Sequence, residues 1–106
     1  MRVELLYTED DSGYMAARQN LVEVLTEDAF ETPIQMIAIG SLEDAELLGF
    51  PGSPTIRIDG EDIVQPSPGP VSLAHRDYGA DGGVPGKAVI RAAVERARGW
   101  GHGRSG

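Results

Sequence analysis

A proline directly precedes the clearest strand pattern of this chain, in the stretch "GFPGSPTIRIDG" at residues 49–60. After Pro54, isoleucines alternate with polar side chains over Thr55–Ile58, and this period of two predicts a strand with one buried face. Proline has no N–H for a sheet ladder, so it is expected only at the first residue of a strand, at an edge or at a bulge. We therefore expect a sharp entry into the strand, with a cis peptide bond between Ser53 and Pro54.

This strand opens an antiparallel hairpin. Asp59 and Gly60 form the dipeptide typical of a type I′ turn, and "EDIV" at residues 61–64 supplies the returning strand. The prolines of "QPSPGPVS", residues 65–72, rule out a central strand and predict a surface loop. The following "LAHRDY", residues 73–78, is a candidate for one short extra strand.

The N-terminal part predicts a parallel strand-helix-strand unit. "VELLY" (Val3–Tyr7) is short, apolar and bounded by polar residues, as expected of a buried strand. Residues 11–30 carry a helical apolar stripe, and Asp11 or Ser12 can cap the first turn. "PIQMIAI" (Pro33–Ile39) is apolar on both faces, which is typical of a strand covered by helices on both sides. A right-handed crossover then makes the two strands parallel.

Two more helices complete the pattern. Ser41 can cap a short helix that ends at Gly49, where we expect a left-handed residue, with Phe50 folding back on the last turn. A final helix follows Pro85 and runs to Arg98. The order β-α-β-α-β-β-α, with one extra strand at most, predicts an α/β fold with a central mixed sheet flanked by helices.

Composition sets the size of the domain and excludes several functions. The 106 residues suffice for one core, which we assign to residues 1–98, and we expect the glycine-rich residues 99–106 to be disordered. Cysteine is absent, so a disulfide, a thiolate nucleophile and a thiolate metal site are excluded. The net charge of −8, from 9 basic and 17 acidic residues, opposes binding to nucleic acid and to anionic membranes. With no apolar run long enough to span a bilayer and an acidic start unlike a signal peptide, we expect a cytoplasmic protein.

Several motifs together point to a known family. "GFPGSPTIR" at residues 49–57, with "VELLYT", "LAHRDY" and "GGVPGKAVIRAAV", resembles the small bacterial thioredoxin-like proteins that are often labelled alkylmercury lyase. The resemblance covers nearly the whole chain, from Val3 to Arg98. It implies a thioredoxin-like fold in which Pro54 is the cis-proline before an antiparallel strand.

The departures from that family bear directly on function. Its members place a Cys-x-x-Cys or Cys-x-x-Tyr segment at the head of the first helix, and the matching residues here are Asp11, Ser12, Gly13 and Tyr14. A further cysteine of the family matches His75. Thioredoxin-type exchange needs a thiolate at that helix start, and an aspartate cannot accept or pass on a disulfide. Thiol-disulfide oxidoreductase activity is therefore excluded for this chain alone.

Asp11 and His75 have two interpretations. As a structural residue, Asp11 caps the first helix and interacts favourably with the helix dipole. As a functional pair, Asp11 and His75 would replace two thiols and suit proton transfer or a metal ion. The pair falls short of the three protein ligands of a catalytic zinc, and Asp10 and Asp77 are speculative additions. Tyr14 lies on the apolar stripe and is expected at the edge of the core.

We favour a binding or regulatory module over an enzyme. Backbone beside a cis-proline can pair with an extended peptide, so we expect an unidentified protein or peptide partner in a groove there. The candidate groove residues are Asp11, Ser12, Gly13, Tyr14, Ser53, Pro54, Thr55 and His75. The alternative is a cysteine-free enzyme or metal-binding protein that uses Asp11 and His75. We expect no cofactor, and either a monomer or a weak homodimer that pairs through the edge strand after Gly60.

Overall fold

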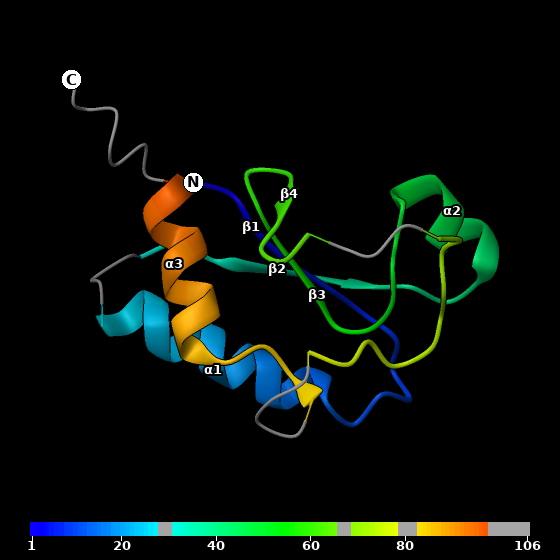
Figure 1. Cartoon of the computed structure of the whole chain (residues 1–106), viewed down its shortest axis with the longest axis horizontal. Coiled ribbons are helices and arrows are strands. Elements are labelled where there is room, and N and C mark those ends of the chain that lie inside the picture. Colours follow the sequence, from blue (N-terminus) through cyan, green and yellow to red (C-terminus); the bar gives the residue numbers. More distant parts are fainter. Residues whose placement is uncertain (28–30, 66–68, 79–82, 98–106) are drawn as a thin grey trace.

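The computed structural model describes residues 1–27, 31–65, 69–78 and 83–97. In these residues a mixed four-stranded sheet carries three helices, which is an α/β fold (Figure 1). The strands are β1 (Val3–Tyr7), β2 (Ile34–Ala38), β3 (Thr55–Ile58) and β4 (Glu61–Asp62), and the helices are α1 (Tyr14–Glu27), α2 (Leu42–Leu48) and α3 (Lys87–Ala97). The predicted order of elements is confirmed, while the tail at 99–106 lies outside the described residues.

The sheet has the strand order β2-β1-β3-β4. β1 runs parallel to β2 and antiparallel to β3, and β3 continues into β4 as the predicted hairpin. Asp59 and Gly60 have positive φ angles of 54° and 86°, as a type I′ turn requires. The candidate extra strand at 73–78 is reduced to a single bridge, in which His75 lies parallel to Ser53.

β2 lies at the edge of the sheet, and Gln35, Met36 and Ala38 are exposed. The prediction that helices cover both faces of β2 is therefore wrong. Its residues are apolar on both faces, but that pattern does not encode which strands will pair with it. β1 pairs with β3 on its other side, so among the described strands β2 has β1 as its single neighbour.

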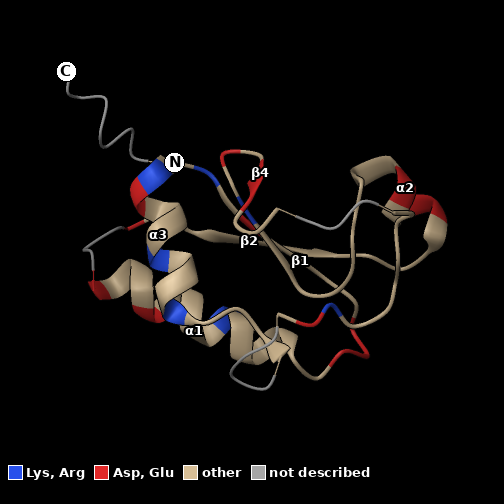
Figure 2. Cartoon of the chain, viewed as in Figure 1, with Lys and Arg blue, Asp and Glu red and all other residues tan. Residues whose placement is uncertain are grey.

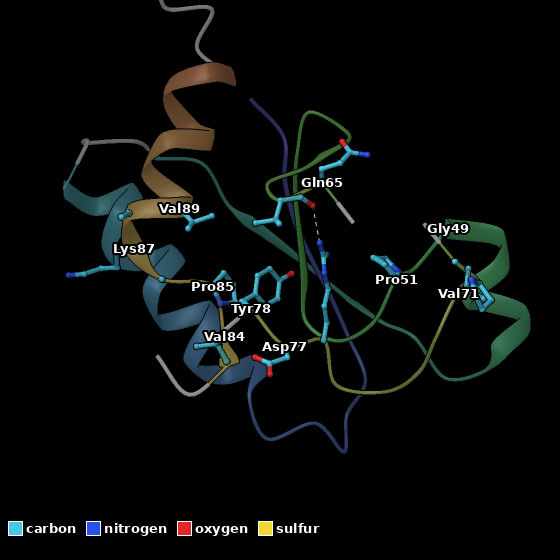
Figure 3. Close-up of a pocket in the computed structure, with 16 residues that line it drawn as sticks. Gly49, Pro51, Gln65, Val71, Asp77, Tyr78, Val84, Pro85, Lys87 and Val89 are labelled. Carbon is cyan, nitrogen blue, oxygen red and sulfur yellow. Dashed lines mark hydrogen bonds between the residues drawn. The ribbon is translucent and has the colours of Figure 1, made fainter. Parts of the chain in front are cut away.

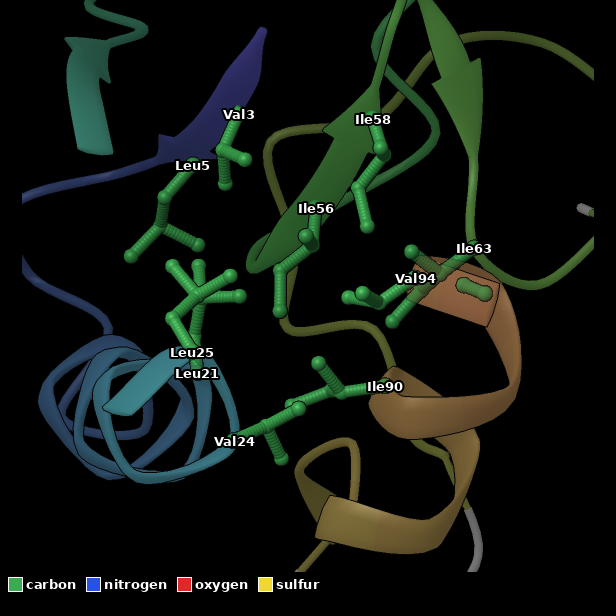
Figure 4. Packing of buried hydrophobic residues seen from close by; sticks show 11 residues of the cluster. Val3, Leu5, Leu21, Val24, Leu25, Ile56, Ile58, Ile63, Ile90 and Val94 are labelled. Carbon is green, nitrogen blue, oxygen red and sulfur yellow. The ribbon is translucent and has the colours of Figure 1, made fainter. Parts of the chain in front are cut away.

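α1 and α3 lie side by side on one face of the sheet and form the main core with β1 and β3 (Figures 1 and 4). The buried members of this core are Val3, Leu5, Leu21, Val24, Leu25, Ile56, Ile58, Ile63, Ile90, Ala93 and Val94. Both isoleucines of the alternating β3 pattern belong to it, and so do Leu21, Val24 and Leu25 of α1, within the predicted helical segment. The helical stripe and the core position of the two isoleucines are thus confirmed, but Thr55 on the other face of β3 is also fully buried, so the expectation of one buried face is wrong.

α2 covers one end of the opposite face, well away from α1 and α3 in Figure 1. Ser41 Oγ accepts a hydrogen bond from the backbone N–H of Asp44 at 3.1 Å, and Gly49 has a left-handed φ of 62°, so both predicted caps are confirmed. The backbone N–H of Phe50 donates to the carbonyl of Ala45 at 2.8 Å, and the Phe50 ring is fully buried. Phe50 therefore anchors the end of α2 to the sheet.

Phe50→Ala should remove this anchor. Truncating a fully buried phenylalanine to alanine costs about 3–5 kcal/mol, and we expect that loss in the free energy of unfolding measured in urea. Leu47→Ala is the matched control, because Leu47 lies on α2 with 78% of its surface exposed. Its effect should stay within about 0.5 kcal/mol. Similar losses in the two variants would contradict the anchoring role of Phe50.

Candidate functional site

Three segments of the chain meet at the carboxylate of Asp11, in the turn between β1 and α1. Asp11 Oδ1 accepts a hydrogen bond from the backbone N–H of Gly13 at 3.0 Å and lies 3.1 Å from His75 Nδ1. Asp11 Oδ2 accepts a hydrogen bond from Ser53 Oγ at 2.7 Å. The structure thus brings together Asp11 and His75, which the alternative interpretation of the sequence required.

Ser53 lies fully buried between β1 and the 73–78 segment, and its bond to Pro54 is cis, as predicted. Its Oγ accepts a hydrogen bond from the backbone N–H of Thr8 at 3.0 Å while donating to Asp11. Its own backbone N–H donates to the carbonyl of Ala74 at 3.0 Å, and its carbonyl accepts from the N–H of Arg76 at 2.6 Å. Every polar group of Ser53 is therefore paired within the chain.

This pairing corrects one expectation about the site. We expected the backbone beside the cis-proline to face outward for pairing with a partner peptide. Residues 74–76 already pair with Ser53 in the way an added strand would. The expectation of an open Ser53 backbone is therefore wrong, because the chain closes that edge itself.

The Asp11 carboxylate is charged and held in place. Burial alone would raise the pKa of this carboxyl group, because the charged form loses water. Hydrogen bonds from Ser53 and Gly13, together with the charge of His75, outweigh burial and hold the Asp11 pKa below its ordinary value. The Asp11 side chain is 8% exposed and that of His75 is 41% exposed. Asp11 is thus a fixed acceptor, while the His75 ring reaches solvent.

The contact with Asp11 indicates which His75 nitrogen carries a proton. An ionised carboxylate can only accept, so we assign a proton to Nδ1. A Cβ placed on Gly83 would lie 3.0 Å from His75 Nε2 and 3.2 Å from Asp77 Oδ1, so glycine leaves room around Nε2. Among the residues whose positions are described, no three or more potential ligands group together to hold a metal ion.

A groove of about 410 Å³ opens above the cluster. It is lined by Thr8, Asp10, Asp11, Ser12, Gly13, Leu73, Ala74 and His75. Four of the predicted groove residues therefore line it, and Ser53 lies beneath it. No sequence pattern pointed to Leu73 and Ala74, because their place in the groove depends on the pairing of the 74–76 segment with Ser53.

Three predicted groove residues lie elsewhere. Tyr14 stacks on Tyr7, with ring centroids 4.3 Å apart and ring planes 24° apart, as expected of a residue at the edge of the core. Pro54 and Thr55 are buried, and Thr55 Oγ1 donates to the carbonyl of Gly52 at 2.7 Å. These three side chains do not line the groove.

A second hollow, of about 720 Å³, lies between the start of α3, the end of α2 and the 76–78 segment (Figure 3). Arg76 on its wall donates to Asp62 Oδ2 at 2.8 Å and to the carbonyl of Val64 at 2.9 Å. Its guanidinium lies 4.8 Å from the centre of the Tyr78 ring. Burial raises the pKa of the Tyr78 hydroxyl, which stays protonated and donates to the carbonyl of Pro54 at 2.6 Å. These groups secure the 73–78 segment to the β3-β4 hairpin.

Sequence reasoning did not single out Arg76. One arginine in "LAHRDY" carries no spacing pattern, and its partners lie 12 and 14 residues away in the chain.

No described helix is long and apolar enough to cross a membrane. Comparison with protein-family models, curated proteins and solved structures finds no match to this chain.

Asp11→Asn should reduce the dependence of stability on pH in the acid range. Because the folded-state pKa of Asp11 is lowered, its charge stabilises the fold above the unfolded-state pKa, and this contribution is lost as the pH falls through the folded-state value. We expect wild type to exceed Asp11→Asn by about 1–3 kcal/mol in free energy of unfolding at about pH 6, with the gap narrowing toward about pH 2.

Asp10→Asn is the matched control, because it removes the neighbouring, exposed carboxylate. Its difference from wild type should remain within about 0.5 kcal/mol throughout the titration. A gap between wild type and Asp11→Asn that does not change with pH would show that the Asp11 charge has no stabilising role.

Proposed function

We propose that the chain is a thioredoxin-like module that binds a protein or peptide partner and performs no thiol chemistry. The fold part of this proposal is supported by the sheet order β2-β1-β3-β4, with β1 parallel to β2 and a β3-β4 hairpin. The cis bond between Ser53 and Pro54, at the entry to β3, supports it further. Because the chain has no cysteine, it cannot exchange disulfides through a thiol of its own.

One observation carries the binding part of the proposal: Asp11, Ser53 and His75 form a connected polar cluster beneath an open groove. Asp11 and His75 match cysteine positions of the family that the sequence resembles. Binding sites combine a concave surface with a few fixed polar groups that orient the ligand. The groove over this cluster meets that description without a thiol.

A partner can still reach backbone groups at this site. Ser53 bonds to residues 74 and 76 of the neighbouring segment, so the N–H and C=O of His75 point away from Ser53. Within the described part of the chain, no hydrogen bond involves these two groups. An extended peptide that lies along the groove can pair with His75, one strand further out than Ser53.

The charges around the groove favour a basic partner. Glu9, Asp10 and Asp11 are consecutive in the turn between β1 and α1, which is acidic in Figure 2. The net charge of −8 adds to the attraction of a cationic segment. The partner class that we propose is therefore an extended peptide rich in lysine or arginine.

A bulky side chain placed in the groove should weaken peptide binding. We would select binders from a library of random linear peptides on the full chain and measure their affinities by calorimetry. Ala74→Trp places a bulky ring in the groove from an exposed position and should weaken binding by about tenfold or more. Ala92→Trp, at an exposed position of α3 outside the groove, should leave the affinity unchanged.

Two outcomes would contradict the binding proposal. One is that no basic peptide is enriched on the wild-type chain. The other is that enriched peptides bind Ala74→Trp as well as they bind wild type, because they would then occupy a different surface.

The contact of 3.1 Å between Asp11 and His75 favours a second candidate, general acid-base catalysis. The carboxylate orients the imidazole, and Nε2 can then take a proton from water or a substrate. Ser53 donates its hydroxyl hydrogen to Asp11, and in the described part of the chain no hydrogen bond joins its Oγ to the His75 ring, so it does not act as the nucleophile of a Ser-His-Asp triad. This candidate is therefore limited to proton transfer.

Hydrolysis of 4-nitrophenyl acetate tests the second candidate, because an imidazole base can activate the attacking water and release acetate and 4-nitrophenolate. His75→Gln should lower the rate by about tenfold or more at neutral pH if Asp11 makes His75 an effective base. His102→Gln is the control, since the chain has 2 histidines. Equal rates for the two variants would eliminate the candidate.

A further inference from the structure

The two edges of the sheet differ in how they oppose pairing with another strand. β4 consists of two residues, Glu61 and Asp62, and both are acidic. β2 has five residues, "IQMIA", and none of them is charged. Natural proteins protect sheet edges by short strands and charged residues, and only the β4 edge has these features. β2 is thus an edge strand without protection against pairing.

The direction of the free backbone groups on β2 follows from its pairing with β1. The N–H of Ile39 donates to the carbonyl of Tyr7 at 2.7 Å, so Ile39 faces β1. Successive residues of a strand point their N–H and C=O groups to opposite sides. Ile34, Met36 and Ala38 therefore direct theirs outward, and no described segment pairs with them.

We propose that two copies of this chain pair through β2, antiparallel and about a two-fold axis at Met36. In this register Met36 faces Met36 of the second copy, and Ile34 faces its Ala38. Each of these pairs has both backbone groups directed at the partner, as a hydrogen-bonded antiparallel pair requires. The β2 strands of the two copies would join both sheets into one.

Charge favours this edge over the one expected from the sequence. In a chain with a net charge of −8, two copies repel each other unless they meet at a neutral surface. Self-pairing of β4 would bring Glu61 close to the acids of the second copy, although Asp62 already pairs with Arg76 at 2.8 Å. Pairing of β2 places no charged residue of either strand in the ladder. We therefore place the dimer contact on β2 instead of on the strand after Gly60, which the sequence had suggested.

The side chains add modest apolar contact. The Met36 side chain lies on the same face of the sheet as Leu5 and is 36% exposed. It would contact Met36 of the second copy across the two-fold axis. One strand buries a small interface compared with permanent dimers, so the dimer is weak and depends on protein concentration. This inference is independent of the groove and its ligand.

Sedimentation velocity of the full chain, from micromolar to millimolar concentration, tests the proposal. We expect wild type to shift from monomer to dimer over this range. Met36→Pro removes an outward N–H donor and breaks no hydrogen bond to β1, so it should keep the fold and weaken dimerisation by roughly tenfold or more. Met36→Lys, which brings two ammonium groups together at the axis, should have the same effect.

Met15→Lys is the matched control, because it makes the same change at an exposed methionine of α1. It should dimerise as wild type does, although it lowers the net negative charge just as Met36→Lys does. A wild-type chain that stays monomeric at millimolar concentration would overturn the proposal. So would dimerisation that Met36→Lys and Met15→Lys change equally.

Discussion

The buried carboxylate of Asp11 connects three parts of the chain that are remote in sequence. It accepts hydrogen bonds from the backbone N–H of Gly13, directly before α1, and from Ser53, and it pairs with His75. Because the Asp11 side chain is only 8% exposed, these donors replace much of its hydration. The Gly13 N–H and the Ser53 hydroxyl are held in place by the backbone and by burial, whereas the exposed His75 ring is held by Asp11 itself. If the groove binds a ligand as proposed, such fixed groups would reduce the entropy lost on binding.

The Ser53 backbone is closed off by another segment of the same chain. Residues 74–76 occupy the position that a paired peptide would take. Arg76 and Tyr78 fasten this segment to the hairpin and to Pro54, so the closure is part of the folded domain. In the proposed binding mode, an extended peptide would therefore pair with His75 instead of Ser53, on the outer side of residues 74–76.

Local patterns predicted most of the elements, because caps, turns and periodicity depend on neighbours in sequence. Ser41, Gly49 and the Asp59-Gly60 turn all have the conformations that their chemistry requires. The failures concern long-range pairing: the edge position of β2 and the closure of Ser53 depend on which segments meet in space. Asp11 and His75 could be named from the sequence, but their contact across 64 residues could not be derived from spacing.

The groove and the β2 edge lie at different places on one sheet, and this has a geometric consequence. Thr8 and the Asp10–Gly13 turn line the groove, so it lies at the carboxyl end of β1. β2 is parallel to β1, and antiparallel pairing of two β2 strands reverses the direction of β1 in the second copy. The two grooves then open at opposite ends of the joined sheet. If both proposals hold, such a dimer would bind two separate peptides without competition, and it would gain avidity only for a partner long enough to span both ends.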